Sequence, residues 1–137
     1  MTVRNDMIIR QGQTFSFQYV HAVGGSPFDL TGYSARMSLR TDFGGPQYAY
    51  LSTGSDADGG TITLGGVAGT ITITMTAEQT KRLLDNLPTF SFPDEMHAAY
   101  GYSHRSEMIY DLEIEDGAGA VTRVLEGKVT IYREVTR

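Results

Sequence analysis

The stretch Glu107-Met108-Ile109-Tyr110-Asp111-Leu112-Glu113-Ile114-Glu115 decides the fold class of this chain. Apolar side chains at 108, 110, 112 and 114 alternate with acidic ones at 107, 111, 113 and 115, and Ile109 interrupts the polar series. A period of two places neighbouring side chains on opposite faces of a β-strand, one toward a core and the other toward water. The stretch is therefore predicted to be an amphipathic strand.

Turn formers directly after this strand predict a hairpin. The sequence Asp116-Gly117-Ala118-Gly119 favours a turn, and residues 121–125 are expected to form the returning strand. Gly127 is expected to break that strand, because glycine weakens the interior of a strand. A separate last strand is then predicted from Lys128 to Tyr132, with Val129 and Ile131 facing inward.

The same alternation recurs along the rest of the chain. Strands are predicted at residues 7–10, 15–19, 34–40, 48–52, 61–64 and 70–75. The last two flank the glycine-rich run 65–69 and are expected to form a hairpin. Residues 24–32 contain paired glycines and a proline, so they are interpreted as a loop under which Phe28 and Leu30 tuck.

One short helix is predicted near residues 77–87. Thr76-Ala77-Glu78-Gln79 has the form of a capping box, in which the threonine hydroxyl and the glutamine side chain each bond the other residue's backbone N–H. Leu83, Leu84 and Leu87 follow at helical spacing, and Pro88 is expected to end the helix.

Length and composition predict a single all-β domain spanning residues 1–137. The chain has no cysteine, so packing must stabilise it. Seven to nine short strands, one helix and no dividing linker favour an antiparallel β-sandwich. The formal net charge of −5 and the scattered Lys and Arg disfavour nucleic-acid binding. No apolar run reaches membrane-spanning length and no secretion-signal layout occurs, so a soluble protein that stays where it is made is expected.

Two groups of residues raise the question of a metal site, and neither has the required pattern. The sequence Asp56-Ala57-Asp58-Gly59 is similar to the start of a calcium loop, but the twelfth position is Val67, where a bidentate glutamate is needed. The second group matches no zinc or metalloprotease spacing; it comprises Asp94, Glu95, His97 and His104. Solvated loops are the preferred interpretation of both, and no metal or cofactor is expected.

The carboxylates of Asp111, Glu113 and Glu115 share one predicted strand face, about 7 Å apart at two-residue spacing. Paired carboxylates can cleave glycosides, but this chemistry needs two different environments, and three acids in one outer row share one environment. A charged face that keeps the sheet soluble, or that meets basic residues of a neighbour, is the preferred interpretation. No nucleophile elbow, phosphate loop or thiol occurs, so the chain is predicted not to be an enzyme.

The segment from Pro88 to Arg105 shows no sustained period of either kind, yet it is rich in aromatic residues. Connections this long inside a compact domain tend to be functional or to order on a partner. Tyr and Phe are enriched in interface cores, so four residues are predicted to bind a partner: Phe90, Phe92, Tyr100 and Tyr102. The alternative is that the segment folds over the end of its own sandwich.

Five groups of residues, taken in order, carry a resemblance to a known family. They are Arg10-Gln11-Gly12-Gln13-Thr14-Phe15, the run from Pro27-Phe28-Asp29-Leu30-Thr31-Gly32 to Arg40, the run from Gly69 to Thr80, and Tyr110-Asp111-Leu112-Glu113-Ile114-Glu115-Asp116-Gly117 with Val124 to Ile131. This succession resembles the small immunoglobulin-like β-sandwich modules of tailed bacteriophages. Such modules occur as baseplate or tail-fibre attachment proteins and as the N-terminal domain of upper-baseplate proteins.

The resemblance implies an immunoglobulin-like sandwich that packs against other baseplate, tail or fibre subunits in the virion and has no active site. The link 87–105 is longer than these modules lead one to expect. Two other functions stay open: a capsid decoration or head-completion protein, and a carbohydrate-binding module in which tyrosines replace the absent tryptophan. A homo-oligomer or a ring would cover the edge strands of a lone sandwich.

Overall fold

The computed structural model describes residues 2–40, 47–54, 58–83 and 105–132. These ranges contain eleven strands, one α-helix (α1) and one 3-10 turn (η1), which confirms the all-β class with a short helix. The bounds are β1 (Val3–Arg4), β2 (Met7–Arg10), β3 (Phe15–Val20), β4 (Ala22–Val23), β5 (Ser26–Pro27), β6 (Ser34–Arg40), β7 (Gln47–Ser52), β8 (Gly60–Leu64), η1 (Gly66–Ala68), β9 (Thr70–Met75), α1 (Ala77–Arg82), β10 (Arg105–Glu115) and β11 (Val121–Tyr132).

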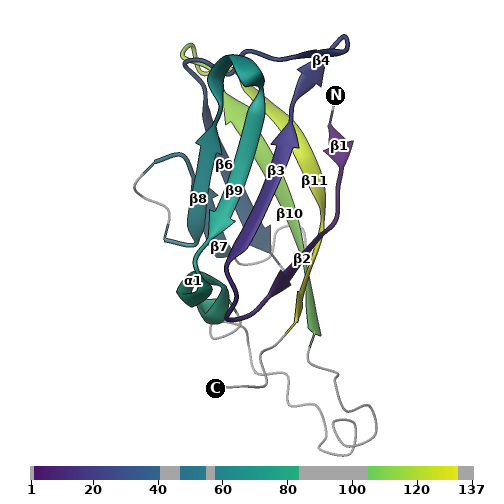
Figure 1. Ribbon diagram of the computed structural model, residues 1–137, viewed down its shortest axis with the longest axis vertical. Coiled ribbons are helices and arrows are strands. Elements are labelled where there is room, and N and C mark those ends of the chain that lie inside the picture. The colour runs from purple at the N-terminus through teal and green to yellow at the C-terminus, as the bar shows by residue number, and fades with distance from the viewer. Residues whose placement is uncertain (1, 41–46, 55–57, 84–104, 133–137) are drawn as a thin grey trace, which may run out of the picture.

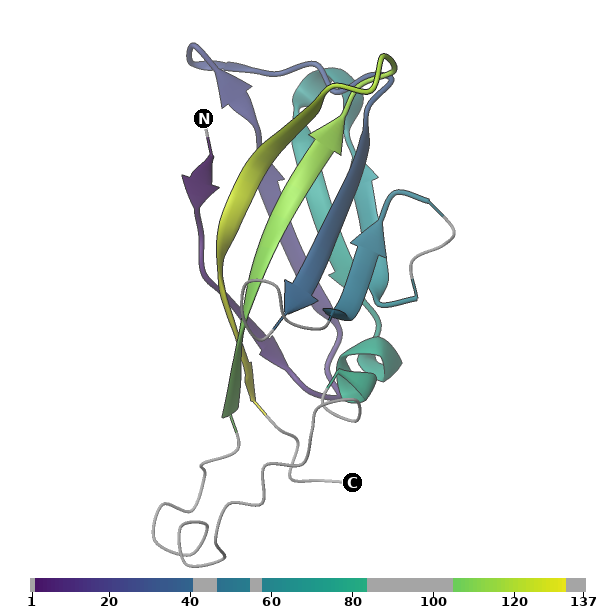
Figure 2. The ribbon, with the colours of Figure 1, turned by 180° about the vertical axis from the view of Figure 1, so that it is seen from behind.

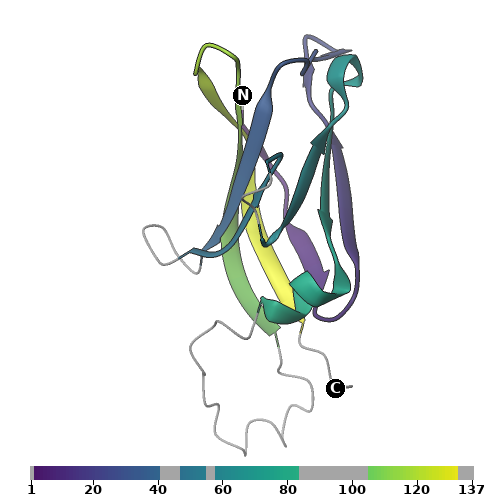
Figure 3. The same ribbon diagram turned by 90° about the vertical axis from the view of Figure 1, so that its left-hand side faces the viewer.

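Nine of these strands join in one sheet that curls into two facing layers (Figures 1 and 3). The first layer is β8-β9-β3, and the second is β7-β6-β10-β11 with β1 and β2 beside β11. A short parallel pairing, Leu51 with Gly60 and Ser52 with Thr61, connects the layers along one side. The orders β3-β9-β8 and β6-β10-β11 correspond to the B-E-D and C-F-G orders of an immunoglobulin-like sandwich.

The core lies between the two layers and is built from the alternate residues that the sequence predicts. Leu112 on β10 is fully buried, and Leu30 in the loop before β6 is 1% exposed. Phe28 is half-buried, with its ring 5.2 Å from that of His21 and 5.6 Å from that of Tyr33. Among the described residues, the other apolar side chains with no exposure are Ile9, Leu39, Leu51, Ile71, Ile73, Met75, Leu125, Val129 and Ile131.

The predicted strand break at Gly127 is wrong. Strand β11 continues from Val121 to Tyr132, and Gly127 pairs with Tyr110 within an unbroken register. The register shift between β10 and β11 lies instead at Leu112 and Glu113. A glycine is needed at 127 for space, because a Cβ there would lie 2.5 Å from the carbonyl oxygen of Asn5.

The chain between β1 and β2 docks on β11 at this glycine. The N–H of Asn5 donates to the carbonyl of Glu126 at 2.9 Å, and a carboxylate oxygen of Asp6 accepts the N–H of Lys128 at 2.9 Å. The hydroxyl of Tyr110 donates to the carbonyl of Asn5. Burial raises the pKa of Tyr110 well above its ordinary value, with Asp6 and Glu126 nearby, so the phenol keeps its proton.

Helix α1 follows β9 and holds the turn between β2 and β3 in place. Its capping box is confirmed, since Thr76 accepts from the N–H of Gln79 at 3.1 Å while Gln79 accepts from the N–H of Thr76 at 2.9 Å. The fully buried Thr80 accepts from the N–H of Gly12 at 3.0 Å and donates to the carbonyl of Gln13 at 2.9 Å. Residues 84–88, which the predicted helix and its stop include, lie outside the described residues.

His21 ties the end of β3 to Gly69, directly before β9, and to Phe28. The backbone N–H of His21 donates to the carbonyl of Gly69, and the backbone carbonyl of His21 accepts from the N–H of Phe28. The imidazole packs on the Phe28 ring. The residue is only 7% exposed. Burial lowers the pKa of this imidazole below its ordinary value of 6.5.

Acidification should therefore destabilise the fold through His21. Because His21 binds a proton more readily in the unfolded chain than in the folded one, its contribution to the free energy of unfolding is present above pH 6.5 and is lost as the pH drops below it. Urea unfolding across this interval should show a shallower pH dependence for His21→Phe than for the natural sequence. Identical pH dependences in the two proteins would assign the effect to other groups.

Candidate interaction face

The outer surfaces of the two layers differ in chemistry. Seen from behind in Figure 2, the layer β7-β6-β10-β11 faces the viewer. The outer side of the opposite layer carries uncharged side chains: Ser16, Gln18, Thr61, Thr63, Thr72 and Thr74. The outer side of the second layer carries what we call the charged face: Arg36, Ser38, Arg40, Ile109, Asp111, Glu113, Glu115, Arg123, Glu126 and Lys128.

Cross-strand ion pairs order the charged face. Arg36 on β6 lies opposite Glu113 on β10, and its guanidinium nitrogens are 3.2 Å from carboxylate oxygens of both Glu113 and Glu115. Arg123 on β11 is 3.4 Å from the carboxylate of Asp111. Hydrogen bonds to Glu113 and Glu115 raise the pKa of Arg36 above its ordinary value, so it remains a fixed cation.

The predicted row of carboxylates is present, but it has none of the features of an acid–base site. The side chains of Asp111, Glu113 and Glu115 are 37%, 28% and 38% exposed, so all three meet water to a similar degree. Each is paired with an arginine of the same chain. The basic partners come from this chain, although the sequence alone could not distinguish them from those of a neighbour. Glycosidic acid catalysis, which needs one apolar carboxyl site, is disfavoured.

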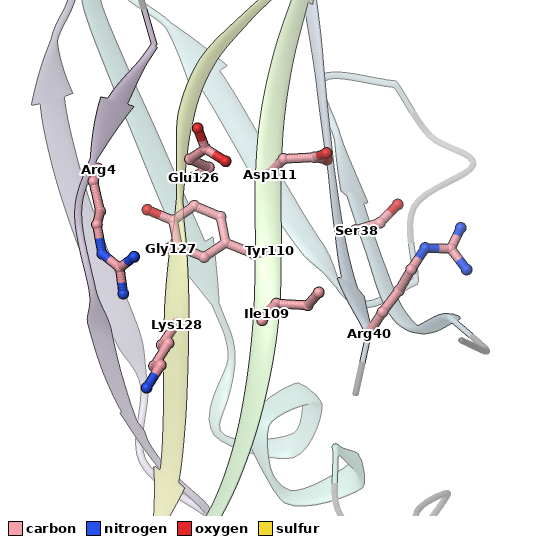
Figure 4. A pocket seen from close by; sticks show the side chains of 9 residues that line it. All are labelled: Arg4, Ser38, Arg40, Ile109, Tyr110, Asp111, Glu126, Gly127 and Lys128. Atoms are coloured by element: carbon pink, nitrogen blue, oxygen red, sulfur yellow. The ribbon is translucent and has the colours of Figure 1, made fainter. Parts of the chain in front are cut away.

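A hollow of about 520 Å³ lies on the charged face between β1, β11, β10 and β6 (Figure 4). The Tyr110 ring crosses Gly127 in Figure 4, and Ile109 lies beside it. Arg4 and Lys128 stand on one side of these residues and Arg40 on the other. The lining residues are Arg4, Ser38, Arg40, Ile109, Tyr110, Asp111, Glu126, Gly127 and Lys128. The hollow thus offers cations and carboxylates around the apolar side chain of Ile109, whereas the side chain of Tyr110 belongs to the core and is only 4% exposed.

A second hollow of about 200 Å³ lies on the same face at its other end. It adjoins the Arg36 ion pairs and the half-buried Tyr50 of β7. Arg and Tyr are enriched in protein interfaces, where their long or aromatic side chains combine apolar area with hydrogen-bonding groups. Both hollows therefore lie on the charged face, and each is lined by at least one arginine and one tyrosine.

No cluster of three or more potential metal ligands occurs among the described residues. Asp58, from the calcium-like stretch, uses its carbonyl to accept a hydrogen bond from the Gln79 side chain at 3.3 Å. The start of that stretch, and the histidines and acids of 94–104, lie outside the described residues. Within the described part of the chain, no helix is long and apolar enough to cross a membrane.

The four residues predicted to bind a partner, Phe90, Phe92, Tyr100 and Tyr102, lie outside the described residues, so that assignment stays a prediction. The structure instead draws attention to the hollow around Ile109 and Lys128, which sequence reasoning missed. One signal was visible in the sequence, namely the apolar Ile109 on the polar side of a strand. Its cross-strand neighbour Lys128 could be identified only from the register of β10 and β11.

No protein-family model matches the chain, and no curated protein matches its sequence. Among solved structures, the chain is similar to one in the crystal structure of ICOS in complex with ICOS-L and an anti ICOS-L VNAR domain, with 13% identity, a TM-score of 0.45 and 97% of this chain covered. It spans 56% of that chain. It is also similar to murine CRIg, with 9% identity, a TM-score of 0.39, and 94% of this chain and 92% of that chain covered.

Proposed function

We propose that this chain is a non-enzymatic interaction module that acts by packing its charged face against another protein. The observation that carries this proposal is the ordered set of arginine–carboxylate pairs flanked by two hollows on one sheet layer. Exposed ion pairs of this kind add little to stability, roughly 0–1 kcal/mol each. Their alternating signs instead fix which partner surface is complementary and in which register it binds.

The partners that we propose are structural proteins of a bacteriophage tail, baseplate or fibre attachment site. Support comes from the order of the residue groups 10–15, 27–40, 69–80, 110–117 and 124–131, which resembles the small immunoglobulin-like modules of such particles. In this role the chain needs no cofactor and works as an adaptor that connects neighbouring subunits. Its location would then be the virion.

The particles of the phage that encodes this chain provide the test. Mass spectrometry should detect the chain in purified virions, and cryo-electron microscopy should place its density at the baseplate, tail or fibre root. Density on the capsid would replace the tail assignment with a head-decoration or head-completion role. Absence from the particle would contradict a virion function altogether.

A matched pair of variants tests the charged face itself. Lys128→Glu inverts a charge beside the larger hollow, whereas Thr63→Glu places a new carboxylate on the exposed outer side of the opposite layer. Incorporation into particles should drop about tenfold or more for Lys128→Glu, since a like-charge contact at an interface costs several kcal/mol. Thr63→Glu should assemble normally. Equal incorporation of both variants would show that the partner binds elsewhere.

A further inference from the structure

The curled sheet has two free edges within the described residues, and they differ in their protection. One edge is formed by β1 and β2, which both pair with β11. The other is β3, which pairs with β9 and ends the strand order of the sheet (Figure 1). An edge strand presents backbone N–H and C=O groups that another strand can pair with, and proteins ordinarily block such pairing.

The edge formed by β1 and β2 is blocked by familiar devices. The two strands have two and four residues, and the chain between them turns its backbone toward β11. Arg4 and Asp6 form an exposed ion pair there, with 3.6 Å between their charged groups. Arg10 lies over the ring of Tyr132. Short strands, a break and charged side chains all discourage a further strand from adding.

Strand β3 has none of these devices. Residues 14–20, Thr-Phe-Ser-Phe-Gln-Tyr-Val, contain no charged residue, no proline and no glycine. The six residues of β3 pair with β9 without any register shift, so the strand has no bulge. A regular, uncharged edge with alternating aromatic residues is well suited to accept another strand.

The register shows which backbone groups this edge offers. The N–H of His21 donates to the carbonyl of Gly69 at 2.8 Å, which continues the pairing of β3 with β9. Hydrogen-bonded pairs alternate along an antiparallel ladder, so the backbone groups of Phe15, Phe17 and Tyr19 face β9. Those of the alternate residues Ser16, Gln18 and Val20 face away from β9, and all three residues are exposed.

The inner side of β3 is also incompletely covered. Phe15, Phe17 and Tyr19 pack against the core but remain half-buried. Their neighbours directly across on β9 have no exposure at all: Met75, Ile73 and Ile71. The free edge therefore carries a row of three partly exposed aromatic side chains, whereas the side chains opposite them on β9 are fully covered.

We propose that β3 pairs antiparallel with β3 of a second copy of this chain, around a two-fold axis at Phe17. In this register Phe17 faces Phe17 of the second copy, and Phe15 faces Tyr19. Every aromatic side chain of the row gains a cross-strand partner, a type of pair that stabilises sheets. Ser16 faces Gln18 of the second copy, and no like charges meet.

The same register uses the free backbone groups of both strands. Ser16 and Gln18 direct their N–H and C=O groups outward, so they form the hydrogen-bonded pairs across the axis. Because each copy contributes the same surface, the contact closes at two chains and does not propagate into a fibre. This inference is independent of the proposed function, because it uses the sheet edge and leaves the charged face free.

The test measures the mass of the whole chain by light scattering after size-exclusion chromatography and by sedimentation across a concentration series. The natural sequence should dimerise reversibly. Ser16→Lys with Gln18→Lys sets lysine opposite lysine of the second copy and should raise the dimer dissociation constant about tenfold or more. Ser16→Lys with Gln18→Glu sets opposite charges against each other and should retain the dimer.

A third double variant is the matched control. Thr61→Lys with Thr63→Lys adds two lysines to exposed positions on the same outer surface, on β8 instead of the edge, and should dimerise like the natural sequence. Circular dichroism melts would establish that all variants fold. A monomer at every concentration, a polydisperse aggregate, or a dimer that survives Ser16→Lys with Gln18→Lys would overturn the proposal. Loss of the dimer in Ser16→Lys with Gln18→Glu would overturn the register.

Discussion

The variant Gly127→Val should lower the free energy of unfolding by about 3 kcal/mol or more. A side chain at 127 would meet the carbonyl oxygen of Asn5 at 2.5 Å and a carboxylate oxygen of Asp6 at 2.8 Å. Both neighbours are held in place by hydrogen bonds to β11, so neither can move away without losing them. Urea denaturation monitored by circular dichroism would measure the loss.

Gly117→Val provides the control for this substitution. Gly117 lies in the turn between β10 and β11, and a side chain there would meet nothing within 4 Å. Its unfolding free energy should change by less than about 0.5 kcal/mol, as for most surface changes. Comparable losses in the two variants would show that valine acts through strand or turn propensity and not through the contact with Asn5.

Tyr110→Phe shows whether the docked chain is the structure that Gly127→Val disrupts. In the natural background, removing the hydroxyl leaves the carbonyl of Asn5 without its Tyr110 donor and should cost about 1–3 kcal/mol. In the Gly127→Val background the bond is already broken, so the same change should cost close to nothing. Additive losses would mean that the two residues act on separate parts of the fold.

The variant Thr80→Val should lower the free energy of unfolding by about 1–3 kcal/mol, although valine has nearly the same shape. The hydroxyl of Thr80 is fully buried, accepts from Gly12 and donates to Gln13. Valine would leave the N–H of Gly12 and the carbonyl of Gln13 without this partner in a part-buried site. Chemical denaturation would again measure the change.

Thr63→Val is the matched control for Thr80→Val. Thr63 is exposed on β8, a strand position that favours a β-branched apolar residue, so its replacement should be neutral within about 0.5 kcal/mol. Thr80→Ser should retain most of the stability because it keeps the hydroxyl. Because valine keeps the methyl group and loses only the hydroxyl, an unfolding free energy for Thr80→Val equal to that of the natural sequence would show that these hydrogen bonds add nothing to stability.

Local periodicity predicted the strands because each follows from a rule that acts over two residues. Residues 107–115 and 70–75 alternate apolar and polar side chains, and both form strands with those faces buried and exposed. The capping box at Thr76 could be predicted for the same reason, since it needs four consecutive residues. Elements defined by neighbours in sequence were therefore accessible without a structure.

The contacts that were missed join residues far apart in the chain. Gly127 resembles a strand breaker until Asn5, from the opposite end of the sequence, is placed against it. The pairing of Arg36 with Glu113 bridges 77 positions and depends on the register of β6 and β10. No local pattern encodes these relations, and the charged face could be predicted only as a row of carboxylates.

The residue groups that carry the resemblance to phage modules have identifiable tasks in folding. Gly12 and Gln13 of the first group are held by Thr80. Asp29 of the second group accepts both the N–H and the hydroxyl of Thr31, at 2.9 and 2.6 Å, and so fixes the turn before β6. These residues therefore act in folding, while the proposals about partners rest on the charged face and the β3 edge.

The parallel pairing of β2 with β11 determines how the molecule would resist a pulling force. Met7 to Arg10 lie beside Val129 to Tyr132 in the same direction. Tension applied to the chain before β2 and after β11 would drag these strands past each other along their axes, so their hydrogen bonds would be loaded together and not opened one at a time. Rupture under load is governed by the unfolding barrier and not by equilibrium stability. This geometry predicts high resistance to a force directed along the strands.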